Sequence, residues 1–294
     1  MAPAPVRTAV IPVAGLGTRF LPVTKAVPKE LLPVVDRPCI DYVVAEAVAC
    51  GIERIVFVTA EGKDAILAYF DRSPTLEAHL AARGQQGMLA EVRRVATMAD
   101  VVAIRQVVRL GLGHAIRSAA PALRTDQDVA VLLGDELFDS PTPALAQLLT
   151  ARAETGAEGV VGLVEVPRDQ THRYGICAGP LDARGRMRIE KMVEKPAPSM
   201  APSTLAIVGK YILPARLFDV LETTTPGAGG EIQLTDAIAV LAQDGGIIGQ
   251  VLDGVRHDTG NVIGLLRASL HYAWKRPELR PEIEALIAEF DERR

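Results

Sequence analysis

The sequence predicts an α/β fold: a Rossmann-like, mostly parallel but mixed central sheet with helices on both faces. Short apolar runs typical of buried strands alternate with segments of helical apolar spacing along the first half of the chain. The runs are rich in β-branched residues, as expected for strands covered on both faces. Two of them end in a glycine turn or an acid, at the strand ends where such sheets bind ligands.

The spacing of apolar residues and of glycines predicts the individual elements. We expect strands over residues 8–13, 54–59, 101–106, 129–133, 159–166, 205–213 and 247–252. We expect helices over residues 40–50, 64–70, 76–94 with a break near Gly84–Gly87, 115–123, 145–155, 215–222, 237–242, 265–274 and 281–290. Between residues 173 and 194 shorter strand-like pieces alternate with turns, which indicates a smaller β-rich part.

Composition narrows the class of protein. The chain has 294 residues, 49% of them hydrophobic and 23% charged, with a net charge of -4. No general basic field favours nucleic acid as a partner, and no apolar run is long enough to cross a membrane. The N-terminus lacks the apolar core of a signal peptide, and the three cysteines are odd in number without metal-ligand spacing. We therefore expect a cytoplasmic protein with reduced thiols.

The first apolar run leads into a loop suited to phosphate. Ala14-Gly15-Leu16-Gly17-Thr18 follows the run, and Arg19, Lys25 and Lys29 come next with few acids nearby. Glycines let the backbone curl close to a ligand, and N–H groups backed by cations hold polyphosphates. An ordinary turn with surface cations would have the same residue types. A dinucleotide fingerprint would need glycine where Phe20 stands, and no Gly-Lys-Ser/Thr of a P-loop follows.

A second strand end carries an acid. Asp135 follows the apolar run 129–133, so its carboxylate is expected at the same edge of the sheet as the glycine loop. A hard oxygen ligand there suits Mg²⁺ carrying a nucleoside triphosphate, although an aspartate capping the next turn would look the same.

The stretch GLGTRFLPVTKAVPKELLPV resembles the signature G-x-G-T-R-x-x-P-x-T-x-x-x-P-K-x-L/M-x-P of nucleotidyl transferases that activate sugar 1-phosphates. It is most similar to the bacterial branch that acts on UTP and glucose 1-phosphate. The resemblance covers about residues 9–270, and it implies the same fold, activity and substrates here. Relatives assemble as homo-oligomers, which implies a dimer or tetramer.

The resemblance also assigns roles to particular residues. Ala14–Thr18, Gln106 and Gly111 would bind the nucleotide, because Arg105-Gln106 and GLGHA at 111–115 look like the family's base-recognition segment. Gly175, Glu194, Lys195, Val208 and Gly209 would bind the sugar phosphate. Without the resemblance, Glu194-Lys195 reads more readily as a solvated surface pair.

The same resemblance implies the metal ligands and shows where this chain differs from the family pattern. Asp135 would bind Mg²⁺ together with Asp236 of EIQLTD, although Asp236 could instead cap the next helix. The HDTGN segment at 257–261 resembles one near the family's active site. The chain departs from the pattern at four places: Glu136, Thr204, Val262 and residues 107–110.

The implied reaction is attack of the sugar phosphate on the α-phosphorus of UTP, with Arg19, Lys29, Lys195 and Asp135 as the catalytic groups. Transfer from dTTP or CTP is the alternative within the family, because Gln106 suits uracil and thymine alike. A catalytically weak UDP-glucose-binding regulator is the alternative outside it. We expect a catalytic domain over 6–275, with a nucleotide-binding part at about 6–150, a sugar-phosphate-binding part at about 151–260, and a helical tail over 276–294.

Overall fold

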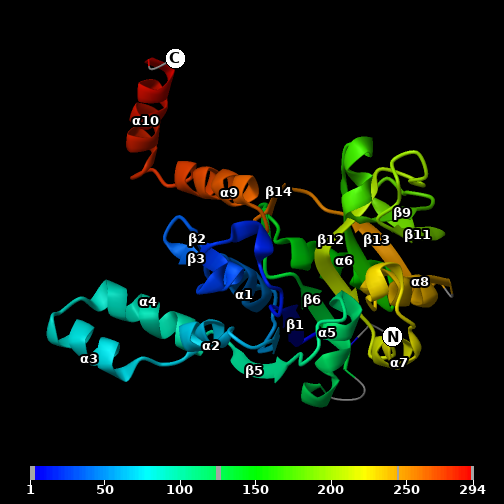
Figure 1. The fold of residues 1–294 in the computed structure, drawn as a ribbon, viewed down its shortest axis with the longest axis horizontal. Helices are drawn as coiled ribbons and strands as arrows, with labels where there is room; N and C mark the ends of the chain where they lie inside the picture. Colours follow the sequence, from blue (N-terminus) through cyan, green and yellow to red (C-terminus); the bar gives the residue numbers. More distant parts are fainter. Residues whose placement is uncertain (1–3, 124–126, 244, 293–294) are drawn as a thin grey trace.

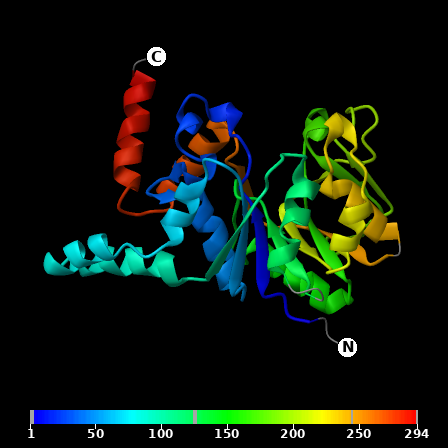
Figure 2. The ribbon, with the colours of Figure 1, turned by 60° about the horizontal axis from the view of Figure 1, so that its bottom comes forward.

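A mixed β-sheet organises the molecule, and helices cover both of its faces (Figures 1 and 2). The structure is a computed structural model that describes residues 4–123, 127–243 and 245–292. Within those residues the sheet has ten strands in the order β10-β13-β8-β12-β6-β1-β4-β5, with β9 paired to β12 and β11 to β9. The mostly parallel sheet expected from the sequence is confirmed, including its mixed character.

The strands of this sheet are β1 (Thr8–Pro12), β4 (Arg54–Thr59), β5 (Asp100–Arg105), β6 (Val129–Leu132), β8 (Gly159–Glu165), β9 (Gly175–Ala178), β10 (Arg186–Arg188), β11 (Lys191–Glu194), β12 (Leu205–Leu213) and β13 (Ile247–Val251). Two small sheets pair β2 (Pro33–Val34) with β3 (Arg37–Pro38) and β7 (Glu136–Asp139) with β14 (Val255–Asp258). The helices are α1 (Cys39–Ala49), α2 (Asp64–Phe70), α3 (Pro74–Ala82), α4 (Gln86–Thr97), α5 (Leu112–Ser118), α6 (Ala144–Thr155), α7 (Leu217–Thr223), α8 (Leu234–Gln243), α9 (Val262–Trp274) and α10 (Arg280–Glu292).

Strand β1 lies in the middle of the parallel half, between β4 and β6. Ala9 and Ile11 point into the core shared with α1, α2 and α6, whereas Val10 points into the core shared with α5, α7 and α8. All three side chains are fully buried. Such two-sided burial explains why the strand reads as a continuous apolar run rather than an alternating one.

Strand β12 runs against its neighbours and joins the two halves of the sheet. It is antiparallel to β6 on one side and to β8 on the other, with a register shift between Ile207 and Tyr211. The expected division near residue 150 falls inside α6, and the sheet continues across it.

Several element boundaries differ from those expected. The expected break near Gly84–Gly87 is confirmed, but the two helices that it separates, α3 and α4, begin at Pro74 and end at Thr97 rather than at 76 and 94; Gly84 between them has a positive φ of 68°. Helix α5 starts at Leu112 rather than Ala115, and α8 starts at Leu234 rather than Ala237. The starts of α5 and α8 lie against each other, because the Gly113 N–H donates to the carbonyl of Ile232 at 2.8 Å.

The small sheet of β7 and β14 was not expected from the sequence. It pairs Glu136 with Asp258, two residues that lie far apart along the chain. Each strand has only four residues and carries charged side chains, so neither shows the apolar pattern of a strand. This sheet brings the HDTGN segment to the end of β6.

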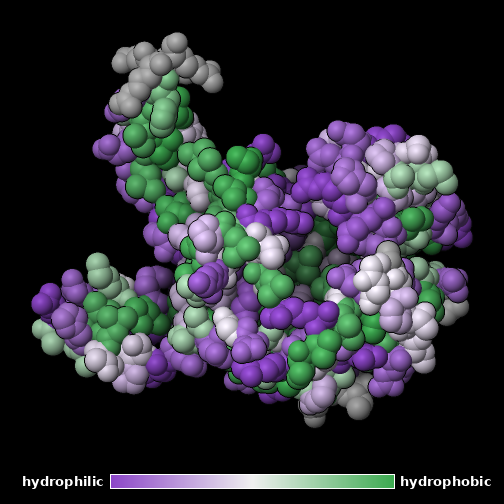
Figure 3. Space-filling model, in the orientation of Figure 1, coloured by the Kyte–Doolittle hydropathy of each residue, from purple (hydrophilic) through white to green (hydrophobic). Residues whose placement is uncertain are grey.

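Helices α9 and α10 form an arm that extends away from the sheet (Figures 1 and 3). Hydrophobic side chains lie exposed along it, among them Leu266, Leu270, Leu286, Ile287 and Phe290. In the described parts of the chain, no helix combines the length and apolar character that crossing a membrane requires.

Candidate active site

Two adjoining cavities open beyond the carboxyl ends of β1 and β6. The first has a volume of about 610 Å³ and the second about 430 Å³. Both are lined by Arg19, Leu112, Leu133 and Asp135, so they meet at these four residues. Ligands in the two cavities would therefore both lie beside Arg19 and Asp135.

The glycine loop forms one wall of the first cavity. Gly17 has a positive φ of 67° and its carbonyl accepts a 2.8 Å hydrogen bond from the Thr24 hydroxyl. A methyl group on Gly17 would also lie 3.1 Å from a Thr24 carbon, so only glycine fits without strain. The predicted nucleotide residues all line this cavity: Ala14, Gly15, Leu16, Gly17, Thr18, Gln106 and Gly111, together with Arg19, Lys29 and Asp135.

Gln106 is buried and lines the first cavity. Its side-chain nitrogen lies 2.9 Å from His114 Nδ1 and 3.4 Å from the carbonyl of Gly111. Burial lowers the pKa of His114, so a neutral imidazole can accept the bond from the amide. This arrangement orients the amide so that its carbonyl oxygen is the group available to an N–H donor.

The EIQLTD segment supports the nucleotide wall from behind. Ile232 donates its N–H to the carbonyl of Leu110 at 2.7 Å and accepts from Gly113. A methyl group on Gly111 or Gly113 would lie 2.7 Å from this segment, which explains both glycines of GLGHA. The sequence alone suggested a metal role for this motif and missed the packing role.

The second cavity contains most of the predicted sugar-phosphate residues. Gly175, Glu194, Lys195 and Gly209 line it, whereas Val208 is buried in the apolar core. The Thr235 hydroxyl donates to Glu194 at 2.7 Å and fixes that carboxylate. Lys195 has a positive φ of 46° and its ammonium lies 3.3 Å from Glu194. The pair lies at the mouth of a cavity and is therefore more than an isolated surface contact.

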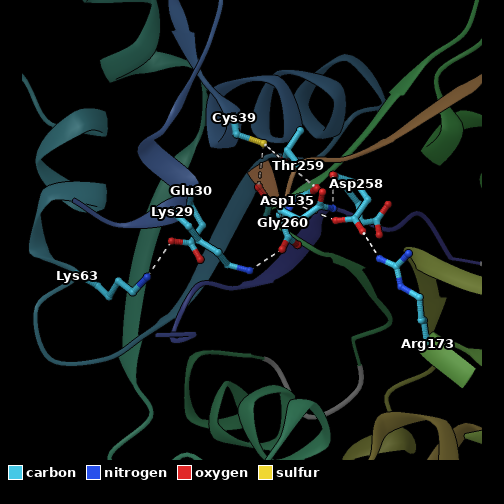
Figure 4. A network of polar contacts seen from close by, with 12 residues as sticks. Lys29, Glu30, Cys39, Lys63, Asp135, Arg173, Asp258, Thr259 and Gly260 are labelled. Atoms are coloured by element: carbon cyan, nitrogen blue, oxygen red, sulfur yellow. Dashed lines mark hydrogen bonds and ion pairs between the residues drawn. The ribbon is translucent and has the colours of Figure 1, made fainter. Parts of the chain in front are cut away.

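The carboxylates of Asp135, which lines both cavities, and Asp258, which lines the second, lie close together (Figure 4). A methyl group on Gly260 would lie 2.6 Å from Asp135 Oδ2 and 3.1 Å from Asp258 Oδ1, so both oxygens face the same small space. Lys29 contacts Asp135 at 2.5 Å, and Arg173 reaches Asp258 from the other side at 3.4 Å. Sequence reasoning placed Asp258 near the active site but gave it no role.

This carboxylate pair fits a divalent cation. Mg²⁺ in nucleotide enzymes typically takes one or two carboxylates and completes its shell with phosphate oxygens and water. Among the described residues no group of three or more acidic, histidine or cysteine side chains is arranged to hold a metal ion.

Asp236, the predicted second ligand, lies elsewhere. It is exposed in the first turn of α8 and lines neither cavity. The geometry therefore favours Asp258 over Asp236 as the partner of Asp135.

Glu136, where the chain departs from the family pattern next to Asp135, is bound by Arg256 Nε at 2.7 Å. Burial raises the pKa of Glu136 to about 7 despite the charge of Arg256, and the carboxylate is fully engaged by that arginine.

The ammonium group of Lys29, which contacts Asp135, stays protonated. Burial alone would lower its pKa, but the charges of Asp135 and Glu30 outweigh burial and raise the pKa above its ordinary value. Glu30 is in turn paired with buried Lys63 at 2.9 Å. Lys63 was missed in the sequence, because a lone lysine between a strand and a helix carries no distinguishing pattern.

Comparisons with known proteins identify the family of this chain. Residues 8–275 match the family model described as Nucleotidyl transferase. The chain belongs to the nucleotidyl transferase family.

Within this family, a UTP–glucose-1-phosphate uridylyltransferase of Staphylococcus haemolyticus is 45% identical over 97% of this chain and 98% of its own. The solved UTP-bound UGPase from Acinetobacter baumannii is 39% identical, with a TM-score of 0.87 over 97% of this chain and 99% of its own. A UDP-glucose pyrophosphorylase complexed with UDP-glucose is 36% identical, with a TM-score of 0.84 over 92% of this chain and all of its own.

Proposed function

We propose that this chain transfers a uridylyl group from UTP to α-D-glucose 1-phosphate, giving UDP-glucose and pyrophosphate. The observation that carries the proposal is the pair of cavities that meet at Arg19 and Asp135. One cavity has the glycine loop and the other the Glu194-Lys195 pair, as a nucleotide and a sugar phosphate would require. The near full-length relatives named for this reaction support the same substrates.

The chain's own residues act by positioning and by neutralising charge. A phosphate oxygen of the sugar attacks the α-phosphorus of UTP, the bond from that phosphorus to the bridging oxygen breaks, and pyrophosphate leaves with the electron pair. The sugar phosphate is already anionic near neutral pH, so no general base is needed. Arg19 and Lys29 neutralise the triphosphate, and Lys195 holds the incoming phosphate.

We infer that Asp135 and Asp258 hold a divalent cation, with Mg²⁺ as the expected ion. When bound, the cation draws electron density from the phosphate oxygens and lowers the repulsion between the two anionic substrates. Asp135 lines both cavities and Asp258 lines the second, and one oxygen of each lies near Gly260, which supports this assignment.

Base selection is assigned to Gln106 and Gly111. The carbonyl oxygen of Gln106 accepts the N3–H of uracil, and the backbone N–H of Gly111 donates to a uracil carbonyl. Cytosine has no N3–H and would leave the Gln106 oxygen unpaired, which disfavours CTP. Thymine has the same donor and acceptors as uracil, so dTTP is the closest competitor.

A direct assay tests the function. Pyrophosphate release from glucose 1-phosphate is measured with UTP, dTTP, CTP or ATP, with Mg²⁺ or with EDTA. Release with UTP that disappears in EDTA is the expected result. Faster release with dTTP would reassign the nucleotide. Failure to release with any of the four would instead favour the regulatory reading of Glu136, Thr204, Val262 and residues 107–110.

We also infer a homo-oligomer and a cytoplasmic location. The exposed apolar side chains of α9 and α10 support assembly with a second copy. All three cysteines lie within the described residues and are unpaired, and burial raises the pKa of Cys39 to about 12. Unreactive free thiols and a nucleoside triphosphate substrate both suit a reducing compartment.

A further inference from the structure

Arg173 lies in the sugar-phosphate cavity and holds a carboxylate assigned to the metal. Its guanidinium is 3.4 Å from Asp258 Oδ2, while Asp258 Oδ1 faces the space near Gly260 and Asp135. Lys29 makes the corresponding contact to Asp135 from the nucleotide side (Figure 4). Each carboxylate of the pair is thus neutralised by one cation, and each cation comes from a different cavity.

The contact of Arg173 is of a kind that breaks easily. The Arg173 side chain is 42% exposed, and it makes a single long contact to Asp258. Exposed ion pairs of this kind contribute little to stability. Nearby Arg256 differs, because it is mostly buried and binds both oxygens of Glu136. Arg256 is therefore a fixed part of the wall, whereas Arg173 is able to leave its carboxylate.

Arg173 lies beside the residues that would bind the sugar phosphate. Tyr174 lies beneath it, with the guanidinium carbon 5.6 Å from the ring centroid, and this contact keeps the arginine at the cavity edge. Lys195 and Arg173 both line the cavity with Gly175 and Glu194. Arginine binds the oxygens of a phosphate in pairs, so a sugar 1-phosphate dianion matches its chemistry better than one carboxylate oxygen does.

We propose that Arg173 is a phosphate-binding residue. Its guanidinium pairs with the Asp258 carboxylate until a divalent cation binds that carboxylate and displaces the arginine. When Asp258 binds the cation, the Arg173 guanidinium is released. It then binds the phosphate of the incoming sugar beside Lys195. Binding of the cation and binding of the sugar phosphate are coupled through this exchange. The inference rests on the proposed function, since it needs a metal at Asp135 and Asp258 and a sugar phosphate in the second cavity.

The test combines metal binding with kinetics. Mn²⁺ is titrated calorimetrically into the protein without substrates, and the Michaelis constant for glucose 1-phosphate is measured at saturating UTP. Arg173→Gln is expected to bind Mn²⁺ more tightly by up to about fivefold, the upper end of what an exposed ion pair contributes. Its Michaelis constant for glucose 1-phosphate is expected to rise about tenfold or more, as for a lost bond to a charged group.

Lys195→Gln is the matched control, because it removes the same charge from the same cavity without touching Asp258. It is expected to raise the Michaelis constant but not to tighten Mn²⁺ binding by the same factor. Equal tightening in both variants, unchanged Mn²⁺ binding in Arg173→Gln, or an unchanged Michaelis constant in that variant would each overturn the exchange. The unmodified chain is assayed in parallel, and its failure to release pyrophosphate would reject the proposed function instead.

Discussion

Arg19 and Lys29 are the two cations that line the nucleotide cavity from the glycine loop and the turn after it. Replacing either by alanine is expected to lower turnover by about 100-fold or more, the usual effect of removing a preorganised charge. Circular dichroism and thermal unfolding check that the variants are folded. Lys25→Ala is the control, because this lysine is exposed and lines neither cavity. Near-normal turnover in both cavity variants would contradict their assignment.

Gly175 is tightly enclosed at the sugar-phosphate cavity. A methyl group there would lie 3.1 Å from Glu194 Oε2, from the Thr235 hydroxyl and from a carbon of Ile207. Gly175→Ala is expected to push Glu194 off Thr235 and to raise the Michaelis constant for glucose 1-phosphate, with little change in that for UTP. Gly87→Ala, on an open face of α4, is the control. An equal rise for both substrates would mean that Gly175 acts on the whole sheet and not on this cavity.

At the residue scale the sequence predicted the glycine loop and most of the cavity residues but not the carboxylate pair. The loop is contiguous, so its chemistry is visible in one stretch. Asp135 and Asp258 meet only because β7 pairs with β14, and the sequence contains no signal for that pairing. Asp236 was preferred because it lies in an unaltered motif, whose packing against residues 110–113 was invisible.

At the scale of elements, the buried carboxylate of Asp41 links helix α1 to helix α4 through hydrogen bonds. Asp41 is fully buried, and it accepts hydrogen bonds from Arg37, Tyr69 and Arg94. Burial by itself would raise its pKa, but these three donors outweigh burial and lower the pKa. Asp41→Asn is expected to lower the free energy of unfolding by about 1–3 kcal/mol, because it weakens the bonds of two arginines.

The same residue gives a pH dependence with a definite sign. A lowered folded-state pKa means that the unfolded state binds the proton more readily, so this contribution is full above the unfolded value of about 3.9. It is lost as the pH falls through the folded-state pKa. The free energy of unfolding, measured with urea between pH 6 and pH 3, is therefore expected to fall more steeply with decreasing pH for the unmodified chain than for Asp41→Asn. Parallel profiles would contradict this reading.

Elements with a clear buried face were predicted better than elements whose ends are fixed by tertiary contacts, for a physical reason. Strands such as β4 and β12 and helix α2 were predicted with their observed bounds, because buried faces leave a clear apolar pattern. Helices α5 and α8 begin earlier than expected, since their first turns are fixed by contact with each other. Tertiary contacts of this kind leave no local signal.

At the scale of the whole molecule, the arm of α9 and α10 is the most separable part. Every residue from 280 to 290 is at least partly exposed, and an isolated 13-residue helix is marginal in water. Deleting residues 280–294 is expected to leave the rest of the chain folded, as measured by circular dichroism, since the arm's ion pair between Arg276 and Asp36 is kept.

Light scattering coupled to size-exclusion chromatography measures the assembly of the same deletion. A smaller assembly than that of the full chain is expected, because the exposed face of Leu286, Ile287 and Phe290 is gone. Leu286→Glu in the full chain is the companion variant and should act in the same direction. An unchanged mass in both would assign assembly to another surface.

The central position of β12 matters while the protein is being made. Strand β6 is fully apolar, and the partner on its open side is β12, which ends at Leu213. A growing chain that has passed β6 thus exposes an unpaired strand edge, the feature that most readily joins another chain. The open edge of β6 therefore stays unpaired until the chain has been made as far as Leu213, the last residue of β12.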